Sequence, residues 1–287
     1  EEGRYFFFVA CICMLLGVLM TYRKPKSTVF YLKEGCLATS LSWILLSLFG
    51  AIPFWISGEI PHWEDALFET ISGFTTTGAT ILGDVEALSH TALIWRSFTH
   101  WIGGMGVLVF LLAILPLSGG SSINLMKAES PGPSVGKLVP KVRYTAMILY
   151  AIYFGMTVIE FIFLLAGKMP LFDALTTAFG TAGTGGFGIK NDSMMGYSPY
   201  IQWVVAIFMI LFGINFNFYF YILYRHFRKA ISMEEIHYYL AMILIAVTII
   251  FLNVRTMYPT GFEAMTHSVF QVASLATSTG FSTTDFD

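Results

Sequence analysis

Six apolar stretches, each close to the length of a membrane-spanning helix, constrain this chain more than any other feature. A helix of about 20 residues crosses the hydrocarbon core of a bilayer. These stretches are apolar on all sides and about twice as long as the strands of a membrane barrel, so helix is their only reasonable state. They are Tyr5–Met20, Cys36–Ile56, Ala92–Leu115, Tyr144–Ala166, Tyr200–Tyr224 and Ile236–Val254. We therefore predict an all-α, multi-pass membrane protein.

The composition supports this class and excludes others. Hydrophobic residues make up 56% of the chain and charged residues 12%, whereas a water-soluble domain carries charge on about a quarter of its residues. A net charge of -2 provides no broad basic surface for nucleic acid. Cys11, Cys13 and Cys36 lie among apolar residues, and we interpret them as packed or lipid-facing thiols without a disulfide framework.

The basic residues sort between the two sides of the predicted membrane. By the positive-inside rule, the side with the larger number is cytoplasmic. Eleven lie on that side, namely Arg23, Lys24, Lys26, Lys33, Lys127, Lys137, Lys141, Arg143, Arg225, Arg228 and Lys229, and five on the other, namely Arg4, Arg96, Lys168, Lys190 and Arg255. The outer side is acidic and includes Glu69. This side is either a vestibule that concentrates cations or a solvated face without a role.

A three-part pattern recurs on the outer side after the second, fourth and sixth stretches, and it indicates an internal repeat. A short apolar segment with an acidic residue near its start comes first, and a run of Thr, Ser and Gly follows. In the first two copies another spanning stretch then returns. The short segments contain Glu64-Asp65-Ala66, Asp173-Ala174 and Glu263-Ala264, and the runs contain Thr76-Thr77-Gly78, Thr184-Gly185-Gly186 and Ser278-Thr279-Gly280.

The short segments cannot cross the membrane, and we predict re-entrant half-helices, the third about one turn longer than the others. Pro61, Pro170 and Pro259 lie at or just before their starts. Non-helical backbone at membrane depth must be buried in protein or line a water-filled path. Glycine-rich runs can turn carbonyl oxygens toward an axis, where uncharged oxygens suit a weakly hydrated monovalent cation.

These motifs resemble the TrkH/KtrB/HKT superfamily of K⁺ and Na⁺ transporters, and the TrkH branch in particular. The resemblance covers nearly the whole chain. It is carried by Thr75–Thr80, His100–Gly106, Gly180–Phe187, Ser278–Phe281 and the loop segment Glu129–Pro133. It implies span, pore helix and span repeats around a pseudo-symmetric, potassium-channel-like pore, four to a polypeptide. In this family, glycine in the filter loops goes with K⁺ selectivity.

The resemblance also implies a function. We expect K⁺ uptake across the plasma membrane through a carbonyl-lined selectivity filter, channel-like and driven by the electrochemical gradient, with no enzymatic chemistry. The K⁺-binding residues expected are Thr76, Thr77, Gly78, Thr184, Gly185, Gly186, Ser278, Thr279 and Gly280. The implied partners are membrane lipid, a second copy in a homodimer and a cytosolic nucleotide-binding regulatory subunit. A Na⁺- or H⁺-coupled carrier of the same family and a truncated, non-conducting subunit stay open as alternatives.

The domain organisation follows from the repeats. We expect a leading transmembrane helix and cytoplasmic loop over residues 1–27, a first pore repeat over 28–125, a second over 126–230 and an incomplete third over 231–287. Against the family pattern, the third returning span and the fourth repeat are missing. The expectation is that the sequence is a fragment of a longer transporter.

Two other function classes have weak support. Gly183–Gly188 matches the dinucleotide fingerprint G-x-G-x-x-G, but neither a strand before it nor a soluble helix after it is predicted. An intramembrane hydrolase would need Ser72 and His100 as nucleophile and base, and no recognised catalytic motif surrounds them.

Several polar or small residues inside the spans have two possible roles. Glu160 is either a proton or cation relay or a structural, hydrogen-bonded carboxyl. His100 is a packed residue or a ligand. Gly103–Gly106 and Gly213–Asn217 either allow close helix packing or line a cavity below the filter.

Overall fold

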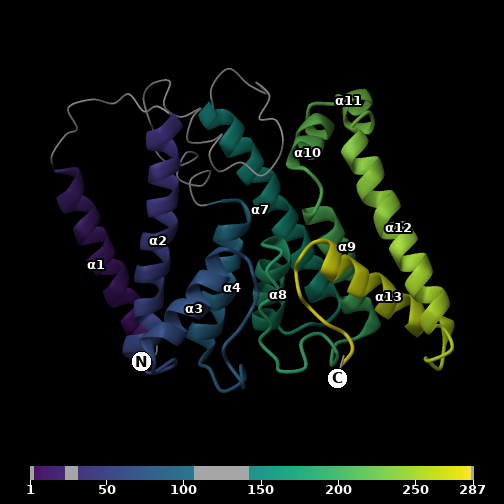
Figure 1. Ribbon diagram of the computed structural model, residues 1–287, viewed down its shortest axis with the longest axis horizontal. Coiled ribbons are helices and arrows are strands. Elements are labelled where there is room, and N and C mark those ends of the chain that lie inside the picture. The colour runs from purple at the N-terminus through teal and green to yellow at the C-terminus, as the bar shows by residue number, and fades with distance from the viewer. Residues whose placement is uncertain (1–2, 23–31, 107–141, 286–287) are drawn as a thin grey trace. The chain divides into compact units, whose positions relative to one another are not determined.

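The structure, a computed structural model, describes residues 3–22, 32–106 and 142–285, and these residues form helices and connecting loops without a strand (Figure 1). The all-α prediction is therefore confirmed. The helices are α1 (Gly3–Thr21), α2 (Leu32–Ser57), α3 (Trp63–Phe74), α4 (His90–Gly104), α7 (Val142–Ala166), α8 (Leu171–Ala182), α9 (Pro199–Phe212), α10 (Phe216–Leu223), α11 (Phe227–Ile231), α12 (Glu234–Val254) and α13 (Gly261–Ala276).

The chain divides into two compact units, which are described separately below. The first unit comprises residues 1–75 and 79–150, and the second comprises residues 76–78 and 151–287. Thr76–Gly78 therefore belongs by its contacts to the second unit, although the residues on both sides of it in the sequence belong to the first.

Four helices, α1, α2, α7 and α12, are long and apolar enough to cross a bilayer. They correspond to four of the six predicted spans. Large apolar side chains are exposed along them, for example Leu244 at 67% and Ile249 at 62% on α12, as expected of helices that face lipid. The third predicted span, Ala92–Leu115, begins as α4 and continues beyond residue 106, outside the described residues.

The fifth predicted span, Tyr200–Tyr224, is not one straight helix. It consists of α9 and α10, which meet at an angle of 89°. Gly213 caps the end of α9, and the Asn215 side chain caps α10 by accepting from the Asn217 amide at 3.0 Å. The prediction of a continuous helix failed because Gly213 and Asn215 supply the two caps that a helix break needs.

In the first unit, α3 packs between α2 and α4. The contact with α2 depends on Gly50, because a Cβ placed there would lie 2.9 Å from both the Phe74 ring and the Thr70 methyl group. The indole of Trp95 on α4 donates to the Gly50 carbonyl oxygen at 3.1 Å. A helix carbonyl bonded to a side chain of a neighbouring helix fixes the relative height of α2 and α4.

In the second unit, the short helix α13 packs against α9 and α12. The indole of Trp203 on α9 donates to the Thr266 hydroxyl on α13 at 2.9 Å. On its other side, Val272 forms a small buried cluster with Ile243 and Val247 of α12. These contacts hold the C-terminal end of α13, and with it the loop that follows, inside the unit.

Candidate functional site

The three predicted half-helices are α3, α8 and α13, with 12, 12 and 16 residues. The expectation that the third is about one turn longer is confirmed. Each carries an acidic residue in its first turn, where the positive pole of the helix favours negative charge. The negative poles of α3, α8 and α13 lead directly into the three Thr, Ser and Gly runs.

The three runs share one unusual backbone conformation. Two positions in each run are left-handed, the first occupied by Thr or Ser and the second, two residues later, by Gly. The φ angles are 53° at Thr76, 50° at Thr184 and 54° at Ser278, and 75° at Gly78, 74° at Gly186 and 88° at Gly280. Left-handed non-glycine residues are uncommon, so three at equivalent positions indicate a conformation that the fold imposes.

In the second and third runs, hydrogen bonds back to the half-helix explain the first left-handed position. The amide of Gly185 donates to the Gly180 carbonyl at 3.0 Å, and that of Thr279 donates to the Ser274 carbonyl at 2.8 Å. Both bonds span five residues and follow a left-handed residue, which defines a Schellman ending of the helix. The amides of Gly185 and Thr279 are therefore already hydrogen-bonded to the ends of their half-helices.

The runs converge within the second unit. A Cβ built on Gly78 would overlap the carbonyl oxygen of Gly185, and one built on Gly186 would overlap the carbonyl oxygen of Thr279. The first run thus lies against the second and the second against the third, each through the residue before the partner's filter glycine. The structure brings together Thr76–Gly78, Thr184–Gly186 and Ser278–Gly280, the nine residues that the sequence singled out.

Small residues near the ends of the half-helices make room for the runs. A Cβ on Gly180 would lie 3.0 Å from the Phe281 ring, and the Ser274 hydroxyl donates to the Phe281 carbonyl oxygen at 2.7 Å. Ser72 occupies the equivalent position on α3. Its hydroxyl is buried and has no hydrogen-bond partner among the described residues, so it is not bonded to His100 as a nucleophile would be to its base.

The segment after the third run is fixed by two sets of bonds. The Met194 amide donates to the Ser282 carbonyl oxygen at 2.9 Å, and the Ser282 amide donates to the Ser193 hydroxyl at 3.1 Å. On α13, a His267 ring nitrogen lies 2.9 Å from the Thr283 hydroxyl, and the Gln271 amide donates to the same hydroxyl at 3.4 Å.

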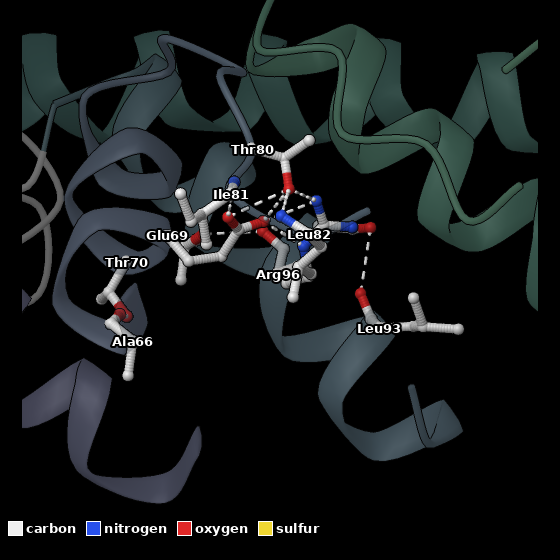
Figure 2. Close-up of polar contacts among 10 residues, drawn as sticks. Ala66, Glu69, Thr70, Thr80, Ile81, Leu82, Leu93 and Arg96 are labelled. Atoms are coloured by element: carbon white, nitrogen blue, oxygen red, sulfur yellow. Dashed lines mark hydrogen bonds and ion pairs between the residues drawn. The ribbon is translucent and has the colours of Figure 1, made fainter. Parts of the chain in front are cut away.

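The segment after the first run is fixed by a buried ion pair (Figure 2). A guanidinium nitrogen of Arg96 on α4 lies 2.6 Å from a carboxylate oxygen of Glu69 on α3. The same carboxylate accepts from the Thr80 hydroxyl at 2.9 Å and from the Ile81 amide at 3.1 Å. Both charged side chains are almost fully buried, at 1% for Glu69 and 2% for Arg96.

The sequence analysis placed Glu69 and Arg96 on the outer side, and the structure shows that both side chains are buried in protein and do not lie on a solvated face. An isolated charge inside protein at membrane depth is costly, and it persists when an opposite charge and hydrogen bonds satisfy it. The available signal was the position of Arg96 within the apolar stretch Ala92–Leu115, because an arginine inside a span needs an acidic partner.

Two further features singled out in the sequence are a loop segment and a buried carboxyl group. Segment Glu129–Pro133 and most of the basic residues assigned to the cytoplasmic side lie outside the described residues. Glu160 on α7 is fully buried, and neither of its carboxylate oxygens has a hydrogen-bond partner among the described residues.

The helices and loops define a class, that of multi-pass membrane proteins in which short helices lead into left-handed, glycine-containing runs that lie together. The profile of one family, described as TrkH, cation transport protein, matches residues 4–287, and the chain belongs to this family. The resemblance that the motifs suggested is therefore confirmed.

Individual relatives are consistent with this assignment. The Trk system potassium uptake protein TrkH of Salmonella typhimurium is 34% identical over 98% of this chain and 60% of that protein. TrkG of Escherichia coli, also a Trk system potassium uptake protein, is 32% identical over 100% of this chain and 60% of that protein. The crystal structure of the potassium transporter TrkH from Vibrio parahaemolyticus matches with a TM-score of 0.83 and 27% identity. The match covers 99% of this chain and 59% of that chain. The chain spans about three-fifths of the length of these relatives.

Proposed function

We propose that this protein takes up K⁺ across the plasma membrane through a filter of backbone carbonyl oxygens, in a channel-like manner driven by the electrochemical gradient. The filter comprises Thr76–Gly78, Thr184–Gly186 and Ser278–Gly280. In this proposal each loop belongs to one pore repeat, over residues 28–125, 126–230 and 231–287, after a leading segment of residues 1–27.

One observation carries the proposal. The three runs have the same left-handed positions and lie against one another at Gly78 with Gly185 and at Gly186 with Thr279. Equivalent backbone segments that meet in this way can present carbonyl oxygens to a shared ion, which replaces its hydration shell with these oxygens.

The chemistry of the runs favours a large monovalent cation. Their side chains are hydroxyls or hydrogen, without a carboxylate within the nine residues. Divalent cations such as Mg²⁺ and Ca²⁺ are usually bound by carboxylates, whereas weakly hydrated K⁺ is satisfied by neutral oxygens. Both relatives named above are potassium uptake proteins, which agrees with this choice.

Ion flux into proteoliposomes tests the proposal, with K⁺ or Na⁺ as the permeant ion. Wild-type protein should carry K⁺ in preference to Na⁺ without a second coupled ion. Gly186→Ser should lower K⁺ flux relative to Na⁺ flux, because a side chain at this position overlaps the Thr279 carbonyl oxygen. Unchanged selectivity in a folded Gly186→Ser protein would contradict the filter assignment.

A Na⁺- or H⁺-coupled carrier is the second candidate, and the buried carboxyl group of Glu160 favours it. Coupling would make K⁺ flux depend on a Na⁺ or pH gradient, whereas the proposed channel-like uptake depends on the K⁺ gradient and voltage alone. The family resemblance further leads us to propose a homodimer with a cytosolic nucleotide-binding regulatory subunit. Mass measurement of the detergent-solubilised complex tests this assembly.

A further inference from the structure

The segment just after the first run, Thr80 and Ile81, which we call the outer end of this run, is exposed and yet is hydrogen-bonded to a buried charge. Thr80 and Ile81 are both exposed residues, and Glu69 accepts hydrogen bonds from the hydroxyl of one and the amide of the other. Exposed loop residues normally exchange their bonds with water. Here the bonds go to a carboxylate inside the protein, where they are stronger than in water.

Arg96 in turn fixes the carboxylate. Its Nε donates to a Glu69 oxygen at 2.7 Å, and its terminal nitrogen lies 3.4 Å from the Thr80 hydroxyl oxygen. The guanidinium is rigid and planar, so bonds from two of its nitrogens restrict the orientation of the carboxylate. Figure 2 shows the side chains of Glu69, Arg96 and Thr80 meeting at one point, while Thr70 lies apart and its hydroxyl donates to the Ala66 carbonyl oxygen of its own helix.

The same position on the third half-helix has a neutral residue. Gln271 precedes Gly280 by nine residues, as Glu69 precedes Gly78. Its amide also donates to the segment after its own run, at 3.4 Å to Thr283 and 3.5 Å to Thr284. These bonds are longer and lack a full charge, so the attachment of the third run by this residue is weaker than that of the first.

We propose that Glu69 and Arg96 are positioning residues that fix the outer end of the first run, and that through this fixation they contribute to the choice between K⁺ and Na⁺. This inference rests on the proposed function. The physical reason is that a smaller ion is coordinated well only when the surrounding oxygens move inward. When a buried charge holds the outer end of the first run, the oxygens of this run resist the inward movement. When the end is released, they can move.

The test uses Thr80→Val, which removes the hydroxyl from the network and leaves the ion pair intact, and Glu69→Gln, which removes the charge. Thr70→Val is the matched control, since it removes from the same helix a buried hydroxyl that donates to the Ala66 carbonyl oxygen. The measured quantities are the ratio of K⁺ to Na⁺ flux in proteoliposomes and the increase in melting temperature that each ion produces in the purified protein.

The expected result is a fall of roughly three- to tenfold in the K⁺ to Na⁺ ratio for Thr80→Val and Glu69→Gln, which is the size of effect expected for the net contribution of one hydrogen bond. Thr70→Val should keep the wild-type ratio. If Glu69→Gln does not fold because it removes the negative charge beside the buried guanidinium of Arg96, the K⁺ to Na⁺ ratio of Thr80→Val alone decides the question.

Failure of this inference and failure of the proposed function would give different results. Wild-type selectivity in a folded Thr80→Val protein, together with wild-type selectivity in Glu69→Gln where that protein folds, would overturn this inference and leave the proposed function standing. A wild-type protein that does not discriminate K⁺ from Na⁺ would overturn the proposed function and the inference with it.

Discussion

The backbone of Gly186 lies so close to the carbonyl oxygen of Thr279 that no Cβ fits between them. The contact joins two runs that are far apart in the sequence, and it combines with a left-handed φ of 74° at Gly186. Glycine is therefore required here for two independent reasons, one steric and one conformational.

Gly186→Ala should reduce selective K⁺ flux by roughly tenfold or more, because the methyl group must displace the Thr279 carbonyl and the left-handed backbone adds about 1 kcal/mol of strain. The matched control is Gly155→Ala on α7, where a Cβ meets no atom within 4 Å. That variant should be stabilised by about 0.5–1 kcal/mol through helix propensity. Equal flux in the two variants would count against the packing of the runs.

Tyr219→Phe should destabilise the broken span. The Tyr219 hydroxyl donates at 2.6 Å to the carbonyl oxygen of Leu211 at the break between α9 and α10, where the same oxygen also accepts from the Ile214 amide at 3.1 Å. Loss of this bond should cost about 1–2 kcal/mol, measured as a lower melting temperature in detergent. Tyr221→Phe is the control and should change little. A similar melting temperature for both variants would show that the Tyr219 hydroxyl does not stabilise the break.

Glu160→Gln separates the two roles of the buried carboxyl group. The amide has almost the same volume and no charge, so a structural Glu160 should tolerate it, with K⁺ flux within about twofold of wild type and stability equal or higher. A relay role would instead abolish flux, because glutamine cannot exchange a proton at this site. Flux should be recorded with and without a pH gradient, so that a coupled carrier is recognised.

His267 should make stability depend on pH. Burial lowers the pKa of the His267 ring below its ordinary value of 6.5, an effect that the nearby Glu263 charge partly offsets. Because the unfolded chain then binds a proton more readily than the folded protein, stability is highest above about pH 6.5 and falls as the pH decreases toward the folded pKa. The ring also stacks on Tyr258, with centroids 4.8 Å apart.

His267→Gln should flatten this part of the profile, measured as the melting temperature between about pH 5 and pH 8. His237, an exposed residue on α12, provides the control, and His237→Gln should keep the wild-type slope. If the slope below pH 6.5 survives in His267→Gln, another group is responsible for it.

The sequence predicted the structure well where a residue type has a single structural role. Glycine at equivalent places in three runs predicted backbone that side chains cannot occupy, and the positive φ angles of Gly78, Gly186 and Gly280 agree. The spacing between the acidic residue and the glycine predicted a longer third half-helix, which α13 confirms.

The sequence predicted the structure less well where the role of a residue depends on the residue that it contacts. The pattern around Gly213 and Asn215 is compatible with close packing in a straight helix as well as with a break, and only the caps decide. Likewise, the roles of Glu69 and Arg96 were not apparent, because nothing in the linear order states that two residues on different helices meet.

The three runs share two left-handed positions, yet the segments after the first and the third run are held by different chemistry. A charged pair supports the first, whereas Gln271, His267 and the segment around Ser193 support the third. The surroundings of the runs therefore differ between repeats, while the two left-handed positions are the same in all three. One consequence is that the copies are no longer interchangeable, and transplanting a half-helix with its loop from one repeat into another should fail unless its neighbours move with it.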